Sequence, residues 1–110
     1  MSLNEKQQRF AHMVGELIHK AESLGYGVTF GEAYRSPEEA ARLAKAGSGI
    51  KRSLHTDRLA IDLNLFRGGR YLSDTQDHMP LGIWWEMQGG SWGGRFGDGN
   101  HYSLEHEGRK

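Results

Sequence analysis

The sequence contains no cysteine among its 110 residues. Disulfide bonds and thiolate metal sites are therefore excluded, and any bound metal must be held by nitrogen and oxygen atoms. Histidine and the carboxylates of aspartate and glutamate are the side chains left for that purpose.

The chain also lacks a surplus of either charge, because 14 lysines and arginines stand against 14 aspartates and glutamates. Nucleic-acid binding usually draws on basic residues concentrated on one face, so we expect no nucleic-acid partner. The pair Lys51-Arg52 is the best local basic patch. Two adjacent basic residues usually belong to a solvated loop, and we interpret them in that way.

Long apolar runs are absent as well. No stretch approaches the roughly 18–20 apolar residues that a membrane-spanning helix requires, so we expect no membrane partner. The polar N-terminal residues lack the apolar stretch of a signal peptide, which predicts a protein made in the cytoplasm. The length fits one compact domain, residues 1–110, and nothing demands more than a monomer. Sixteen glycines indicate that much of the chain is turn and loop.

The clearest periodic pattern lies in the first 25 residues and predicts an amphipathic helix. Apolar residues recur there at three- and four-residue spacing, as a helix with one buried face requires. These residues are Phe10, Met13, Val14, Leu17, Ile18, Ala21 and Leu24. Ser2 and Glu5 predict a capping box at the start, and Gly25 predicts a left-handed stop. His12 and His19 lie in this helix without a third ligand beside them, so we interpret both as surface residues.

A strand and a second helix are predicted next. Residues 26–34 alternate bulky with small or polar side chains, which is typical of a strand buried on one face. Ser36, Pro37 and Glu39 then predict a second capping box with proline at the first helical position, opening a short helix that runs through about Ala46.

The middle of the chain predicts a loop and a hairpin. Residues 47–54 are expected to form a flexible loop. Residues 58–66 alternate as a strand with one face on the core and the other on a cleft, and Asp62 lies on the cleft face. The segment 67–70 contains a Gly-Gly pair suited to a tight hairpin, with a short partner strand at 71–72.

A third helix is predicted before the glycine-rich segment. Ser73 and Gln76 could cap its start, and Pro80 is expected to restart it, so that residues 81–87 form the helical core. His78 has no supporting group of ligands and is interpreted as a surface residue.

Residues 89–99 contain six glycines together with Trp92 and Phe96. Flexible linkers seldom carry large aromatic side chains, so we predict a structured active-site loop. Residues 101–104 predict a last strand, and residues 105–110 a charged tail. His106 in this tail is expected at the surface, with support of the site as the alternative.

His55, Asp62 and His101 are the residues that we predict to bind a metal. Each lies on a predicted strand or at a junction of loop and strand that faces the cleft. Two histidines and one carboxylate suit a hydrolytic zinc site, which uses three protein ligands and leaves one position for water. Such chemistry also needs a base beside the metal, and Asp98, three residues before His101, is the candidate.

Simpler interpretations stay open for these residues. The two histidines could be hydrogen-bonded loop residues, and Asp62 could be a carboxylate at a turn or strand edge. Arg35 could form a surface ion pair or cap the helix that starts at Ser36. We expect three aromatic side chains to lie in the core or in the cleft wall, namely those of Trp84, Trp85 and Phe96.

Several short motifs in order resemble the D-alanyl-D-alanine carboxypeptidase and phage L-alanyl-D-glutamate endopeptidase family of zinc peptidases. The similarity runs from Tyr34 to Tyr102. The motifs are Tyr34-Arg35-Ser36, Ser53-x-His55, Ala60-x-Asp62, Trp92-Gly93-Gly94 and Asp98-x-x-His101-Tyr102. The resemblance implies the fold of hedgehog-type and D,D-peptidases, a small α+β domain in which helices flank an antiparallel sheet.

The resemblance also implies roles for particular residues. One zinc ion would be held by the three residues named above, with Asp98 as general base. Arg35 would stabilise negative charge on the scissile carbonyl or bind a substrate carboxylate. Three residues of the motifs are candidate substrate-binding residues, namely Ser53, Trp92 and Tyr102.

This sequence departs from the family at two positions. Many members have glycine where this chain has Arg58, and many have glutamate where Asp98 stands. The endopeptidases of phage lysis use aspartate at the second position, so the resemblance favours an endopeptidase.

The substrate class implied by the resemblance is peptidoglycan stem peptides. We predict an L-alanyl-D-glutamate endopeptidase of a phage or prophage lysin, which would stay in the cytoplasm until host lysis and then act on the wall. A D-alanyl-D-alanine carboxypeptidase or dipeptidase is the alternative enzyme. A non-catalytic zinc-binding or wall-binding module, with Trp84, Trp85 and Trp92 on glycan or peptide, is the alternative from another class.

Overall fold

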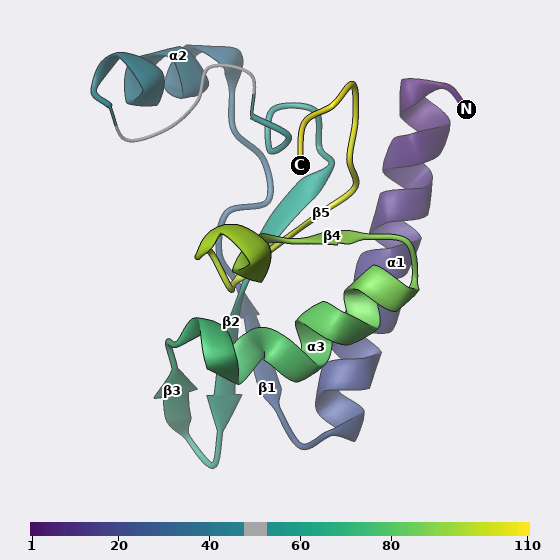
Figure 1. Ribbon diagram of the computed structural model, residues 1–110, viewed down its shortest axis with the longest axis vertical. Coiled ribbons are helices and arrows are strands. Elements are labelled where there is room, and N and C mark those ends of the chain that lie inside the picture. The colour runs from purple at the N-terminus through teal and green to yellow at the C-terminus, as the bar shows by residue number, and fades with distance from the viewer. Residues whose placement is uncertain (48–52) are drawn as a thin grey trace.

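The computed structural model describes residues 1–47 and 53–110. The expected basic patch Lys51-Arg52 and most of the expected loop 47–54 lie outside these residues. In chain order, the described elements are α1 (Leu3–Ser23), β1 (Gly27–Phe30), α2 (Pro37–Lys45), β2 (Ala60–Arg67), β3 (Arg70–Leu72), α3 (Thr75–Met87), β4 (Ser91–Trp92), the short 3₁₀ helix η1 (Gly93–Phe96) and β5 (His101–Ser103). They form an α+β fold, as the sequence predicts (Figure 1).

The strands build one antiparallel sheet around β2, the longest strand. The order along the sheet is β1-β2-β5-β4, and β3 also pairs with β2. β5, the last described strand of the chain, therefore lies between β2 and β4. Within the β2–β5 pair, Asp62 lies directly opposite His101.

The hydrophobic core lies between the sheet and the helices α1 and α3. Successive side chains of a strand point to opposite faces, so Ile61, Leu63 and Leu65 of β2 enter the core while Asp62 points away from it. Trp85 of α3 is fully buried in the same cluster. The face of the sheet that carries Asp62 is therefore free to hold polar side chains.

The predictions for α1 and for the β2–β3 hairpin are confirmed. Ser2 and Glu5 form the reciprocal capping box, and Gly25 follows the helix with a φ of +89°. Gly68 and Gly69 both have positive φ angles, as a two-residue hairpin turn of this hand requires.

The predicted start of α2 is confirmed in part. The Ser36 side chain accepts a hydrogen bond from the backbone nitrogen of Glu39, and Pro37 is the first helical residue. The Glu39 side chain accepts hydrogen bonds from Arg42, so the reciprocal half of the expected capping box is replaced by an ion pair.

The prediction for α3 was wrong in its start. The helix begins after Asp74, whose backbone nitrogen donates to the Asp77 carboxylate, and it runs through Pro80 without a restart. Proline leaves the carbonyl of the residue four positions earlier without its helical donor. That residue is Gln76, which is exposed, so its carbonyl can be hydrated.

The two segments near the C-terminus are ordered by specific contacts. The glycine-rich segment forms β4 and η1, which confirms that it is structured. The expected charged tail is instead a turn closed by a bridge between His106 and Arg109. Arg109 also pairs with Asp57 at 2.6 Å, so this turn is fixed to the segment that carries His55.

Candidate metal centre

The sheet positions two of the three predicted ligands. Asp62 follows the alternation of β2 and points away from the core, because its neighbours Ile61 and Leu63 point into it. His101 is its cross-strand partner at the start of β5, where only 8% of the residue is exposed. Residues directly opposite in an antiparallel pair have adjacent side chains. The register of β2 and β5 thus brings a carboxylate and an imidazole together.

His55, the third predicted ligand, comes from the turn before β2. The Ser53 hydroxyl accepts a hydrogen bond from the backbone nitrogen of His55 at 3.1 Å. The carbonyl of His55 accepts one from the backbone nitrogen of Arg35 at 3.2 Å. The residue is 4% exposed. A buried turn with its backbone fixed on both sides holds the imidazole in place.

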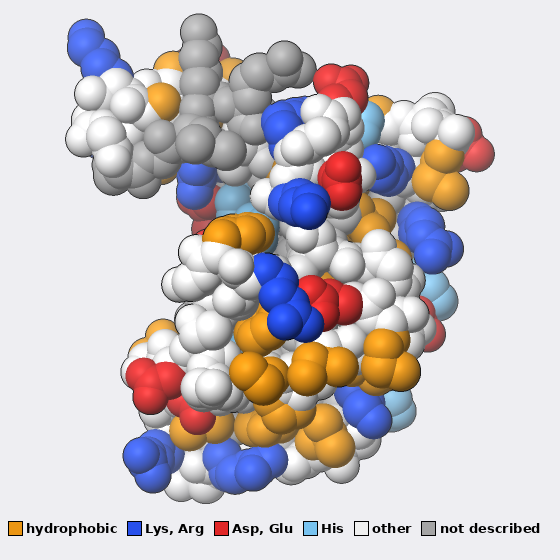
Figure 2. Space-filling model, viewed as in Figure 1, with side chains coloured by type: hydrophobic (Ala, Val, Ile, Leu, Met, Phe, Trp, Pro, Cys, Tyr) orange, Lys and Arg blue, Asp and Glu red, His pale blue; other side chains and the backbone are white. Residues whose placement is uncertain are grey.

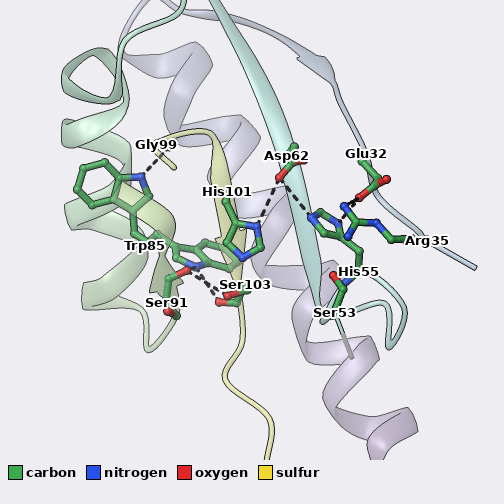
Figure 3. A network of polar contacts seen from close by, with 11 residues as sticks. Glu32, Arg35, Ser53, His55, Asp62, Trp85, Ser91, Gly99, His101 and Ser103 are labelled. Atoms are coloured by element: carbon green, nitrogen blue, oxygen red, sulfur yellow. Dashed lines mark hydrogen bonds and ion pairs between the residues drawn. The ribbon is translucent and has the colours of Figure 1, made fainter. Parts of the chain in front are cut away.

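The three side chains meet at one point (Figure 3). Asp62 Oδ1 lies 3.4 Å from His55 Nε2 and 3.5 Å from His101 Nδ1. The ligand atoms of the three residues all lie within 4.8 Å of one another. The set is the His-Asp-His group expected from the sequence, and it could bind a metal ion.

Hydrogen bonding inside the group favours a cation there. Asp62 Oδ1 is buried and has no hydrogen-bond partner, although it faces two imidazoles. A buried acceptor of this kind is costly unless a partner compensates it. Nitrogen and oxygen donors in this combination fit zinc and similar divalent ions. The residues present therefore fit the zinc ion that the resemblance of the sequence motifs implies.

Asp62 is charged at neutral pH. Burial by itself would raise the pKa of Asp62, but the neighbouring imidazoles of His101 and His55 outweigh it and lower the pKa to about 2. The carboxylate is thus available as an anionic ligand across the whole neutral range.

Arg35 lies beside the metal group and is held by a residue that our sequence interpretation missed. Its Nη2 donates to Glu32 Oε1 at 2.5 Å, and Glu32 Oε1 lies 3.7 Å from His55 Nδ1. The Arg35 Nε atom is buried without a hydrogen-bond partner. The only signal for Glu32 in the sequence is a carboxylate three residues before Arg35.

Asp98, the expected base, lies in the turn between η1 and β5. Its backbone nitrogen donates to the carbonyl of Gly93 at 2.9 Å, and its carbonyl accepts from the backbone nitrogen of His101 at 3.2 Å. Asp98 is exposed. A Cβ on Gly93 would collide with the Asp98 carbonyl and with the His101 side chain, so glycine is required for this close approach.

The structure gives internal contacts to the three residues expected to bind substrate. Ser53 holds the backbone of His55, as described above. The Trp92 indole donates to the carbonyl of Gly99 at 2.7 Å and is 2% exposed. Tyr102 is fully buried, and its hydroxyl lies 2.8 Å from Nδ1 of His78. Direct contact with a substrate would require these side chains to leave their present positions.

His78 is buried, which corrects the prediction that it lies at the surface. It is 2% exposed and packs against Tyr102, the residue after His101. Burial lowers its pKa to about 4, an effect that the nearby Asp77 carboxylate opposes only in part. The imidazole is therefore neutral at pH 7 and forms part of the support beneath β5.

Other aromatic and histidine residues lie as the sequence suggests. Trp85 is in the core, whereas Phe96 is 55% exposed and its ring lies 6.0 Å from that of His101. Phe96 therefore forms part of the wall beside the metal group. His12 and His19 are exposed on α1.

The visible face of the molecule is hollowed on one side (Figure 2). In Figure 2 a recess separates the region of α2 from the rest of the molecule, and histidine and charged side chains are visible at its inner end. Among the described residues, none of the helices combines the length and the apolar character needed to cross a membrane.

Comparison with known proteins bears on the fold. No protein-family model and no curated protein matches the chain. Among solved structures, it is similar to the L-Ala D-Glu endopeptidase ChiX of Serratia marcescens, with a TM-score of 0.70 and 21% sequence identity over 86% of this chain and 79% of that one. The resemblance suggested by the motifs is confirmed for the fold. The chain therefore has the α+β fold of an L-Ala D-Glu endopeptidase, with a His-Asp-His group that could bind a metal ion.

Proposed function

We propose that the protein is a zinc-dependent L-alanyl-D-glutamate endopeptidase that acts on peptidoglycan stem peptides. The observation that carries the proposal is the group formed by His55, Asp62 and His101, whose ligand atoms lie within 4.8 Å of one another. The fold shared with ChiX, an L-Ala D-Glu endopeptidase, supports the choice of substrate.

The chemistry is metal-assisted hydrolysis of a peptide bond. A zinc ion held by these three residues would lower the pKa of a coordinated water to near 7 and polarise the scissile carbonyl. Asp98 accepts the proton of the attacking water and later returns it to the leaving amine. The Arg35 guanidinium stabilises negative charge on the carbonyl oxygen or binds a substrate carboxylate.

The biological setting that we propose is a phage or prophage lysin, held in the cytoplasm until host lysis. Asp98 supports this setting, because the phage endopeptidases of the family that the sequence resembles also have aspartate at this position. The test is to induce a phage that carries the gene. We expect the host wall to be cut on induction, and we expect this cutting to be lost when the gene is deleted.

The reaction is tested with purified muropeptides. We expect the zinc-loaded protein to release fragments with a new N-terminal D-glutamate, identified by mass spectrometry. EDTA should abolish the release, and added zinc should restore it. Release of terminal D-alanine alone would overturn the endopeptidase assignment in favour of a carboxypeptidase.

The catalytic role of Asp98 is tested by the substitution Asp98→Asn. Loss of a general base typically reduces the rate about 10²–10⁴-fold. Zinc content, measured by elemental analysis, should stay at one ion per chain, because Asp98 is not a ligand. Unchanged hydrolysis would contradict the role of Asp98. Absence of hydrolysis already in the wild-type protein, with zinc bound, would favour a non-catalytic zinc-binding or wall-binding module.

A further inference from the structure

Glu32 occupies a position between the expected metal ligand His55 and the expected catalytic residue Arg35. A single oxygen, Oε1, lies 2.5 Å from Arg35 Nη2 and 3.7 Å from His55 Nδ1 (Figure 3). The Glu32 side chain is 32% exposed, so water screens this charge only in part. One carboxylate oxygen thus faces both groups.

The backbone around Glu32 is fixed to the metal group on both sides. The carbonyl of Glu32 accepts a hydrogen bond from the backbone nitrogen of Asp62 at 2.9 Å, which continues the β1–β2 pairing beyond β1. Three residues after Glu32, the backbone N–H of Arg35 donates a hydrogen bond to the carbonyl of His55. The side chain of Glu32 therefore starts from a rigid position beside two of the three ligand residues.

His55 needs an acceptor on the side that faces Glu32. Its Nε2 atom faces Asp62 and is the atom placed to bind a cation, so the ring proton must lie on Nδ1. Nδ1 is buried and has no hydrogen-bond partner at present. Glu32 Oε1 is the carboxylate oxygen near it, about 0.5 Å beyond the longest ordinary N–H···O distance.

We propose that Glu32 is the positioning residue of the metal site. Its carboxylate accepts the Nδ1–H of His55, which fixes the tautomer and the ring orientation that present Nε2 to the metal. A carboxylate in this place also makes the imidazole a stronger ligand. Through the same oxygen, Glu32 holds the Arg35 guanidinium at the edge of the site.

The proposal rests on the metal binding assumed in the proposed function, and zinc affinity tests it without any assay of hydrolysis. We expect Glu32→Ala to weaken zinc binding about 10–100-fold, measured by competition with a chromophoric chelator. Glu32→Gln keeps an oxygen that can accept the proton but loses the charge, so its affinity should lie between those of the wild type and Glu32→Ala.

Two control variants separate the effect on His55 from loss of an ion pair. Glu86 is a carboxylate of similar exposure, 28%, that pairs with Arg95, and Glu86→Ala should leave zinc affinity within about threefold of the wild type. Arg35→Ala should also leave zinc affinity close to that of the wild type, because it removes the guanidinium but leaves Glu32 beside His55. A loss of zinc affinity in Arg35→Ala equal to that in Glu32→Ala would show that Glu32 acts only through Arg35.

The ring nitrogens of His55 provide a second measurement. In the zinc-loaded wild-type protein, nitrogen-15 NMR should show a protonated Nδ1 whose proton resonance moves upfield in Glu32→Ala. Wild-type zinc affinity and unchanged His55 resonances in Glu32→Ala would overturn the proposal. If the wild-type protein itself bound no zinc, the proposed function would fail instead.

Discussion

Arg58 combines two features that oppose one another in the free energy of folding. Its φ angle is +57°, in the left-handed region that favours glycine, and its guanidinium lies 4.1 Å from the centre of the Tyr34 ring. Left-handed backbone costs a residue with a Cβ about 1–2 kcal/mol, whereas an exposed cation–π contact returns about 0.5–1 kcal/mol. This balance explains how arginine can occupy position 58, where the peptidase family that the sequence resembles often has glycine.

Two substitutions of Arg58 separate the backbone strain from the ring contact. Both Arg58→Gly and Arg58→Ala lose the contact with Tyr34, but only glycine removes the strain. We expect Arg58→Gly to be more stable than Arg58→Ala by about 1 kcal/mol in urea-induced unfolding. Equal stability of the two variants would show that the backbone at residue 58 is not strained.

His78 makes stability depend on pH below neutrality. Its pKa is about 4 in the folded protein, against 6.5 for an exposed histidine. Between these values the unfolded chain binds a proton that the folded chain does not, so the free energy of unfolding falls as the pH falls. At about 1.36 kcal/mol per pKa unit, the loss reaches at most about 3 kcal/mol near pH 4.

This dependence is measured by urea unfolding between pH 7 and pH 4.5 in EDTA, which removes any contribution from metal. We expect His78→Gln to show a smaller loss of stability over the same range than the wild type. Asp62 does not interfere, because its pKa of about 2 and ordinary value of 3.8 place its contribution below this window. Parallel pH profiles of the two proteins would contradict the assignment to His78.

Single residues of the site differ in how well the sequence predicts them. His55, Asp62 and His101 were predictable because few residue types bind metals and cysteine is absent. Glu32 and His78 were not, because their roles depend on which atoms lie next to them after folding. A carboxylate before an arginine, or a histidine in a helix, carries no signal of its own.

At the scale of elements, two glycines inside helices differ in what surrounds them. A Cβ on Gly15 of α1 would meet nothing within 4 Å, whereas a Cβ on Gly82 of α3 would overlap the Trp92 ring. Glycine weakens a helix by about 0.5–1 kcal/mol relative to alanine. At this cost, Gly82 allows α3 to pack directly on Trp92.

The matched substitutions Gly15→Ala and Gly82→Ala should therefore shift stability in opposite directions. We expect the first to stabilise the protein by about 0.5–1 kcal/mol and the second to destabilise it by about 1–3 kcal/mol. Thermal unfolding followed by circular dichroism measures both. A stabilising effect of Gly82→Ala would mean that Trp92 does not pack on α3 as described.

The elements that the sequence predicts well are those specified by local signals. The apolar stripe and caps of α1, and the Gly-Gly turn between β2 and β3, are contained in neighbouring residues. The start of α3 was missed because Asp74 and Ser73 are equally good caps in isolation. Pro80 was expected to interrupt the helix, but its cost depends on whether water reaches the freed carbonyl of Gln76.

For the whole molecule, metal binding should be a large part of the stability. A ligand present at a thousandfold excess over its dissociation constant stabilises the folded state by about 4 kcal/mol. We expect the unfolding temperature of the zinc-loaded wild-type protein to be higher than that of wild-type protein stripped of metal with EDTA. His55→Ala should lose this increase, because it removes one of the three proposed ligands.

The matched control is His12→Ala, which removes an exposed histidine of α1 that pairs with Glu16. This variant should keep the full zinc-dependent increase. If His55→Ala also kept it, the ligand assignment would be wrong.

The arrangement of the whole sheet could not be read from the sequence. Strand patterns show which residues alternate, but not that β5 pairs with β2 or in which register. The register decides that Asp62 faces His101, since a slip of one residue would turn one of the two side chains to the opposite face.

The position of β5 also bears on the order of events during synthesis. β4 pairs only with β5 among the described strands, and β5 contributes His101 while Asp62 and His55 lie about forty residues earlier. A nascent chain that has not yet released residues 101–103 from the ribosome can form α1 and the β2–β3 hairpin from local contacts. It cannot join the two halves of its sheet or assemble three ligands around an ion. The proposed peptidase activity would thus begin only when β5 has filled the interior of the sheet.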